Sequence, residues 1–223
     1  MFLDDTFCGK HALKDVLIKS YGSVINAVAS MTVFPPKSIV NSLGAHAVCN
    51  AVRISKQHSS LGKQCGEKVP IAEGGEAMLD ENCIPDGIFK FCFKPSVSRS
   101  IKRNNAYTQL NHIYQCAGRG PDYFANLANL CLTPNFIAKL TDEDETIQKM
   151  LQYRAFQLYC FNPEGFDFSE QAEEFSSLSW FEMPIQNVAS FEEFRNKFFA
   201  KKDKWFKAAR GCGVNEAFGI TES

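Results

Sequence analysis

The spacing of apolar residues predicts helices over most of this chain. Apolar positions recur every three or four residues in two N-terminal stretches, residues 4–21 and 23–31, and again in residues 143–159. Thr141-Asp142 is the expected cap of the third helix. A stretch rich in phenylalanine and charge, residues 191–199, predicts an amphipathic C-terminal helix followed by a basic tail. The apolar face of the third helix consists of Ile147, Met150, Leu151, Ala155 and Leu158.

Two segments in the middle of the chain carry a strand pattern instead. Residues 66–71 and 76–80 flank the pair Gly74-Gly75, which favours a tight turn. These residues predict a short β-hairpin.

A second strand pattern leads directly into a helix. Residues 109–114 are rich in β-favouring side chains and are followed by the breaker Gly118-Arg119-Gly120-Pro121. Residues 128–132 form another short apolar run, and Thr133 and Pro134 then suit the N-cap and the first position of a helix. The expected fold class is therefore α+β, mainly helical, with a small ββα core and a short hairpin.

Residues 37–56 have the rhythm of a helix, a glycine-containing turn and a second helix. This is the outline of a helix-turn-helix, in which Arg53 and Lys56 would be available to reach phosphates or base edges of DNA. Any short helical hairpin with a glycine turn has the same pattern, so ordinary helix packing is the alternative.

Composition indicates a chain that buries a substantial core. It has 223 residues, of which 45% are hydrophobic and 20 are phenylalanine, enough for one large folded unit. Changes in pattern divide it into an N-terminal helical region (1–63), a β-containing region (64–165) and a C-terminal helical region (166–223). We expect the three regions to form one compact unit.

Charge and cysteine content constrain the class of protein further. The net charge of −1 gives no overall basic field, although residues 96–105 form a local basic stretch with Arg99, Lys102 and Arg103. No run of eighteen apolar residues and no signal-peptide pattern occurs, so a soluble cytoplasmic protein is expected. The nine cysteines include no C-x-x-C pair or zinc-ligand spacing, which predicts reduced residues in the core.

The strand, loop, strand and helix of residues 109–142 resemble the core of the HNH, or ββα-metal, nucleases. The resemblance implies that His112 is the general base and that Asn129 tethers the loop. It also implies that Asn135 on the helix helps to hold one divalent metal ion, magnesium or manganese. Asn111 stands where the family usually has an acidic or histidine metal ligand.

These residue types suit phosphodiester hydrolysis. Imidazole has an unperturbed pKa of about 6.5, which allows it to accept a proton from water near neutral pH. A hard divalent cation stabilises charge on the leaving oxygen and accepts amide oxygens as ligands. Arg119 and the basic stretch around Arg99, Lys102 and Arg103 would bind the phosphates. The resulting hypothesis is a metal-dependent DNA endonuclease of the restriction or mobile-element kind, active as a monomer or a homodimer.

Three other interpretations remain open at this stage. Asparagine favours turns for its own reasons, so His112 and its neighbours would then have only structural roles. A non-enzymatic DNA-binding protein would use the helical hairpin of residues 37–56. Finally, Cys8-Gly9-Lys10-His11-Ala12-Leu13 is similar to the start of the central helix in some papain-like cysteine hydrolases, with Cys8 as the nucleophile.

Overall fold

Most of the backbone in this computed structural model is helical, and the strands are short. The structure describes residues 9–72, 74–103 and 107–206, and the side chains of residues 102, 103 and 202–206 lie outside the description. The predicted α+β class with a helical majority is confirmed. The helices are α1 (Gly9–Tyr21), α2 (Val24–Met31), α3 (Lys37–Ser42), α4 (Lys56–Ser60), α5 (Cys83–Phe91), α6 (Pro95–Arg103), α7 (Pro121–Phe124), α8 (Asn135–Glu143), α9 (Glu145–Tyr159), α10 (Ser169–Phe175) and α11 (Phe191–Phe206), with short 3-10 turns η1 (Leu127–Asn129) and η2 (Ile185–Asn187). The strands are β1 (Ala51–Arg53), β2 (Lys68–Pro70), β3 (Glu76–Asp80), β4 (Thr108–His112) and β5 (Leu130–Pro134).

The first sheet has three strands in the order β1-β3-β2. Strands β2 and β3 pair antiparallel, with Val69 opposite Ala77, which confirms the predicted hairpin. Gly74 and Gly75 in its turn have φ angles of 94° and 86°, a conformation that side chains with a Cβ rarely adopt. Strand β1 adds to the other side of β3 in the parallel sense.

The prediction of a helical hairpin over residues 37–56 is wrong in its second half. Helix α3 forms, but the chain then turns through Gly44 and Ala45, which have φ angles of 63° and 55°. Residues 51–53 form the strand β1 instead of a helix, because they pair with β3 and bury an apolar side against the sheet. The backbone of Val48 also bonds to the carbonyl of Ala125, so contacts far along the chain decide this segment.

The second sheet is the hairpin of β4 and β5, and α8 follows it directly. The ladder runs from Thr108 opposite Pro134 to His112 opposite Leu130, so the predicted strand, strand and helix are present in this order. The expected capping is wrong, because Pro134 is the N-cap of α8 and Thr133 still belongs to β5. The Thr133 hydroxyl accepts a hydrogen bond from the amide of Asn111 at 2.7 Å instead.

Helix α9 also begins later than its sequence pattern suggests. Thr141 and Asp142 lie in α8, and Asp144 is the residue that caps α9, accepting a hydrogen bond from the backbone of Ile147 at 3.3 Å. The predicted cap is therefore wrong, because α8 continues through Glu143. Of the predicted apolar stripe, Ile147, Met150, Leu151 and Ala155 are buried, whereas Leu158 is only partly buried.

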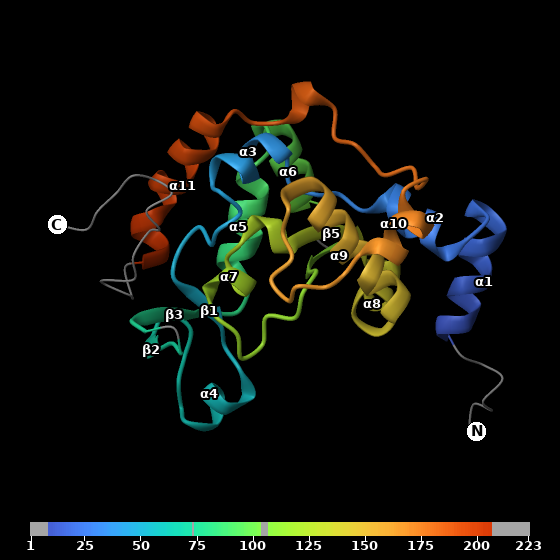
Figure 1. Cartoon of the computed structure of the whole chain (residues 1–223). Helices are drawn as coiled ribbons and strands as arrows, with labels where there is room; N and C mark the ends of the chain where they lie inside the picture. Colours follow the sequence, from blue (N-terminus) through green and yellow to red (C-terminus); the bar gives the residue numbers. More distant parts are fainter. Residues whose placement is uncertain (1–8, 73, 104–106, 207–223) are drawn as a thin grey trace.

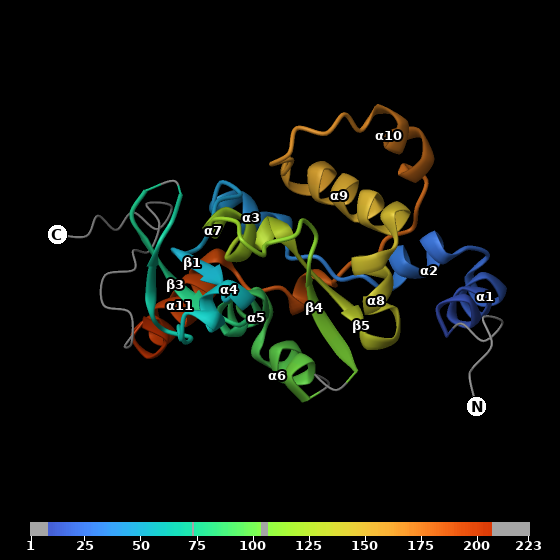
Figure 2. The ribbon, with the colours of Figure 1, turned by 90° about the horizontal axis from the view of Figure 1, so that it is seen from below.

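One hydrophobic core joins most of these elements. It contains residues of every predicted region, from Val28 in α2 through Phe124 in α7 to Phe194 and Phe198 in α11. A small separate cluster on the three-stranded sheet includes Val52 and Leu79. The helices α1 and α2 lie at one end of the molecule, the three-stranded sheet and α11 at the other (Figure 1). The β4–β5 hairpin lies between them, beside α8 (Figure 2).

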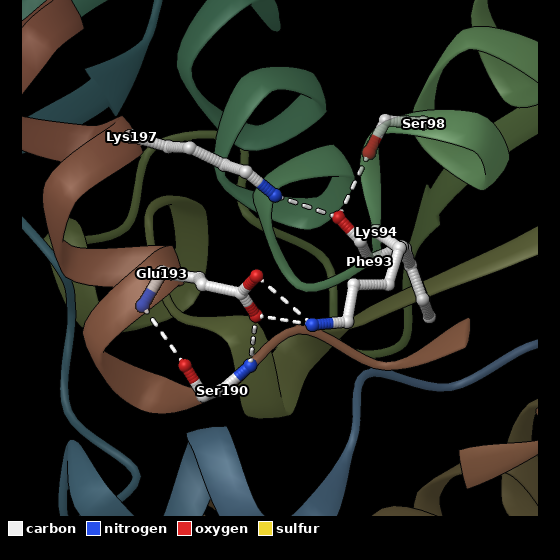
Figure 3. A network of polar contacts seen from close by, with 6 residues as sticks. All are labelled: Phe93, Lys94, Ser98, Ser190, Glu193 and Lys197. Atoms are coloured by element: carbon white, nitrogen blue, oxygen red, sulfur yellow. Dashed lines mark hydrogen bonds and ion pairs between the residues drawn. The ribbon is translucent and has the colours of Figure 1, made fainter. Parts of the chain in front are cut away.

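A polar network attaches the start of α11 to the segment that joins α5 and α6 (Figure 3). The backbone of Ser190 donates to the Glu193 carboxylate at 2.7 Å, and the backbone of Glu193 donates to the Ser190 hydroxyl at 3.1 Å, a reciprocal cap. Lys94 donates to both carboxylate oxygens at 2.9 and 2.8 Å. Hydrogen bonding to Lys94 lowers the pKa of Glu193 to about 2. Lys197 and Ser98 complete the network by donating to the carbonyl of Phe93 at 2.8 and 3.1 Å.

The described cysteines carry free thiols, but they are not all in the core. Cys49, Cys92, Cys116 and Cys131 are buried, as predicted. The prediction is wrong for three exposed cysteines, Cys65, Cys83 and Cys160, which lie in loops or at helix ends. Cys8 and Cys212 fall outside the described residues. No helix in the described part of the chain is long and apolar enough to cross a membrane.

Candidate functional site

His112 ends β4 with its ring fixed in one orientation. Its Nε2 lies 3.1 Å from the carbonyl oxygen of Phe124, and its ring stacks on the Phe124 ring at 5.5 Å between centroids. A carbonyl oxygen only accepts hydrogen bonds, so Nε2 carries the hydrogen and Nδ1 is left as the acceptor. Burial lowers the pKa of His112 to about 4, against the opposing effect of the Phe124 carbonyl, and the charge of Arg53 lowers it further. The imidazole is therefore neutral at neutral pH.

The long loop between β4 and β5 is closed at its base by Asn129. This side chain is fully buried, and its amide oxygen accepts from the backbone N–H of Tyr114 at 2.7 Å. Its Nδ2 donates to the carbonyls of Tyr114 at 2.9 Å and Tyr123 at 2.6 Å. Asn129 thus connects both sides of the loop. One of its partners, Tyr123, directly precedes Phe124, whose carbonyl orients His112.

A second buried asparagine, Asn126, has a related role that the sequence did not indicate. Its amide oxygen accepts from the backbone of Ala128 at 2.9 Å, and its Nδ2 donates to the carbonyl of Ala45 at 2.6 Å. Nearby, the Asp122 carboxylate accepts from the backbone of Ala47 at 2.9 Å. These bonds attach the loop to the turn after α3. The sequence around an asparagine can indicate a turn, but it gives no indication of a hydrogen-bond partner 81 residues away.

The two asparagines predicted as metal ligands lie at different ends of the site. Asn111 precedes His112 and is buried, with its Nδ2 bonded to Thr133 and its Oδ1 accepting from Gln109 at 3.0 Å. Asn135 begins α8, next to the Thr108 end of the β4–β5 ladder. Four residues of strand separate that end from His112, roughly 14 Å at the usual strand rise. The structure therefore does not bring Asn135 to His112.

Helix α8 instead brings Asp142 to the cleft that His112 lines. Asp142 lies seven residues after Asn135, two turns further along α8, on the same face of the helix. Burial raises the pKa of this carboxyl, while the charges of Lys139 and Arg53 lower it. In the sequence Asp142 has the pattern of a helix cap, so its place in the site was not predicted. The signal for that place is its spacing of seven residues from Asn135, which puts both residues on the same face of α8.

Three clefts surround His112 and the following loop, with volumes of about 230, 430 and 510 Å³. Arg53 lines both the smallest and the largest, and Arg119 lines both the second and the largest. The first, which we call the amide cleft, is lined by Arg53, Asn82, Gln109, Leu110, Asn111, His112, Gln115, Cys116, Ala117 and Asp142. The second, the acidic cleft, shares His112, Gln115 and Asp142 with the first and adds Glu145, Glu164, Lys149 and other residues. The third, the tyrosine cleft, includes Arg53, His58, Arg119 and Tyr123.

The donors around His112 fit a weakly held hard cation. Among the residues that the structure describes, no three His, Cys, Asp or Glu side chains are grouped to hold a metal ion. Magnesium usually keeps several waters and needs only one or two carboxylates when a substrate phosphate completes its shell. The Asp142 carboxylate and the Asn111 amide oxygen, both in the amide cleft, match that requirement.

The predicted DNA-binding residues fall into two groups. Arg53 lies at the site, where it lines two clefts, one of them together with Cys116. Arg119 pairs with Glu164 at 2.6 Å and stacks over the Tyr123 ring at 4.5 Å. Lys56 and Arg99 are exposed on α4 and α6 and line none of the three clefts, although Ser55 and Gln57 on either side of Lys56 line the tyrosine cleft. The side chains of Lys102 and Arg103 lie outside the description.

Comparison of the chain with models of known protein families, with curated proteins and with solved structures finds no match. The function is therefore inferred from the site itself.

Proposed function

We propose that this protein is a metal-dependent endonuclease that hydrolyses phosphodiester bonds of DNA at the clefts around His112. The observation that supports this most is the state of His112. The Phe124 carbonyl fixes its tautomer with Nδ1 unprotonated, and its ring lines two clefts together with Asp142. A neutral, oriented imidazole beside a carboxylate that attracts a cation is the arrangement that metal-assisted hydrolysis needs.

The proposed roles follow from the chemistry of each side chain. Water transfers a proton to Nδ1 of His112 as its oxygen bonds to phosphorus, and the bond from phosphorus to the leaving oxygen breaks. Arg53 binds the phosphate, because a guanidinium matches phosphate oxygens and Arg53 lines the same cleft. Asp142 and Asn111 would hold the divalent cation, which supplies a Lewis acid when bound. Asn129 is a positioning residue, since it acts only through the loop that fixes His112.

A pKa of about 4 makes free His112 a weak base. Catalysis near neutral pH therefore requires the substrate to raise this pKa. A phosphate in the cleft does so, since a nearby negative charge favours the protonated imidazole. The enzyme would then activate water only when DNA is in place.

The alternative of a non-enzymatic DNA-binding protein loses its original basis. It depended on a helical hairpin over residues 37–56, and residues 51–53 form a strand. Arg53 now lies beside His112 in the amide cleft, where a phosphate-binding role in hydrolysis suits it better.

The test is cleavage of supercoiled plasmid by the purified protein in magnesium, manganese or EDTA. We expect cuts that need the metal and that fall at least about 100-fold in His112→Ala, the usual contribution of a general base. His11→Ala is the matched control, because His11 is exposed on α1. Equal cutting by His112→Ala and the unaltered protein, or none by either on several DNAs, would reject the proposal.

A further inference from the structure

We propose that the amide cleft binds one unpaired nucleobase, with guanine the best match, beside the phosphate that His112 acts on. This inference rests on the proposed function and names its substrate: single-stranded nucleic acid, or a duplex with an unpaired base. The cleft combines one guanidinium with an unusual concentration of carboxamides, from Asn82, Gln109, Asn111 and Gln115.

Asn82 contributes a hydrogen-bond acceptor that the fold leaves unused. It occupies the N-cap position of α5, where an asparagine side chain normally accepts a bond from the first turn. Here the Asp80 carboxylate takes that bond, from the backbone of Ile84 at 3.0 Å. The Asn82 amide oxygen is buried and has no hydrogen-bond partner among the described residues. A buried acceptor of this kind calls for a donor from outside the chain.

Gln109, held by Asn111, contributes a second acceptor to the amide cleft. The amide of Asn111 is itself held by Thr133, and the Oδ1 of Asn111 accepts from Nε2 of Gln109 at 3.0 Å. With its donor engaged, Gln109 has its Oε1 left to accept. Gln115 is exposed and lines both the amide and the acidic cleft. Its side chain makes no hydrogen bond to the described residues. Acceptors for a base therefore come from the N-cap of α5 and from β4, while Arg53 in the same cleft keeps its proposed role toward the phosphate.

Guanine fits this distribution better than the other bases. Its Watson–Crick edge carries two adjacent donors, N1–H and an amino group, which two carboxamide oxygens of the cleft can accept. Adenine and cytosine each offer only an amino group as donor. The volume of about 230 Å³ lies below the usual range of about 300–1,000 Å³ for drug-sized ligands, which suits a single planar base. A base whose edge is paired in a duplex cannot enter, so the base must be unpaired.

The first experiment measures binding in EDTA, without cleavage. Fluorescence anisotropy compares a labelled oligothymidylate with the same strand carrying one central guanine, adenine or abasic site. We expect guanine to tighten binding on the order of tenfold over thymine, from one bidentate contact. Gln109→Ala should remove most of this preference and leave binding of the plain oligothymidylate intact. Gln186→Ala is the control, because Gln186 is exposed on η2 and lines none of the three clefts.

The second experiment maps cleavage of single-stranded and duplex DNA with magnesium. Cuts next to guanine in single strands, shifted or spread in Gln109→Ala, are the expected result. Guanine-dependent binding without any cleavage would reject the nuclease and keep the base site. Cleavage without base preference, or equal preference in a folded Gln109→Ala and the unaltered protein, would overturn the base site and keep the nuclease. Thermal unfolding of each variant confirms that it is folded.

Discussion

Replacing Asn129 by alanine should both destabilise the protein and loosen the loop that orients His112. The substitution removes three hydrogen bonds of a fully buried side chain, with heavy-atom distances of 2.7, 2.9 and 2.6 Å. A typical intramolecular bond contributes about 1 kcal/mol, and a buried partner left unsatisfied costs about 1–3 kcal/mol. Tyr114 is buried, so its N–H and carbonyl lose their partners with little access to water, whereas Tyr123 is half-buried. The expected loss in the free energy of unfolding is about 3–5 kcal/mol.

Urea unfolding, followed by circular dichroism, measures this loss from the midpoint and slope of the transition. The matched control is Asn41→Ala, an asparagine exposed on α3, which should change stability by less than about 0.5 kcal/mol. A loss below about 1 kcal/mol in Asn129→Ala would refute the reasoning, because at least one buried group would then have found another partner.

Asn129→Asp separates the hydrogen bonds from the volume of the side chain. The carboxylate still accepts from Tyr114, but it loses both donated bonds and places a charge against two carbonyl oxygens. Burial and these carbonyls raise the pKa of the introduced carboxyl in the folded state. Stability gained from its protonated form is therefore present at low pH and lost as pH rises. The gap between this variant and the unaltered protein should narrow from about pH 7 to about pH 5.

Three further predictions concern pH and metal. The pKa of His112 falls from 6.5 to about 4 on folding, so the unfolded chain binds the extra proton and stability decreases as pH falls through this window. The free energy of unfolding decreases by about 3 kcal/mol at most. Urea unfolding of the unaltered protein and of His112→Gln should show a weaker pH dependence in the variant. Hydrogen bonding to Lys94 lowers the pKa of Glu193 to about 2, so its carboxylate stabilises the folded protein at pH values above the ordinary pKa of glutamate. This effect is lost as pH falls through about 2, so Glu193→Gln should lower the melting temperature at neutral pH but not near pH 2. Asp142→Asn should raise the magnesium concentration for half-maximal cleavage about tenfold or more, whereas the exposed Asp15→Asn should not.

Each of these has a result that contradicts it. An unchanged pH dependence in His112→Gln would mean that other groups account for the acid sensitivity. A Glu193→Gln variant that melts like the unaltered protein at neutral pH would remove the network in Figure 3 from the stabilising contacts. An unchanged magnesium requirement in Asp142→Asn would exclude this carboxylate as the cation ligand.

The sequence predicted those parts of the fold that local patterns determine. The hairpin of β2 and β3 and the β4–β5–α8 unit have alternating or apolar runs and turn residues in the right order, although Pro134 caps α8 and does not begin it. Helix α9 has an apolar face at helical spacing. In each case, the residues that specify the element lie within or next to it.

The parts that failed depend on distant partners. Residues 51–53 have no strong strand signal of their own, and they form β1 because β3, some 25 residues later, presents a free edge. The cap of α9 shifted because α8 keeps its helical bonds through Glu143. Likewise, the sequence indicated His112 and Asn129 but not Asp142 or the link from Asn126 to Ala45, since these meet only after α8 and the long loop have packed.

The misassigned segment explains how the site acquires its positive charge. In a recognition helix, Arg53 would have faced a DNA groove at a distance from the β4–β5–α8 unit. As the last residue of β1, it instead lines the amide cleft, where its charge lowers the pKa of His112 and of Asp142. The three-stranded sheet therefore has a definite role in the proposed chemistry, because its strand β1 positions Arg53 in the same cleft as His112 of the separate β4–β5 hairpin. A substitution that weakens the pairing of β1 with β3, such as Val52→Pro, should raise the pKa of His112 slightly, because burial remains the main cause of its low value. NMR titration of the imidazole would detect the change. If the pKa of His112 does not rise at all in a variant that remains folded, the charge of Arg53 does not act on His112, and the electrostatic link between the sheet and the hairpin is refuted.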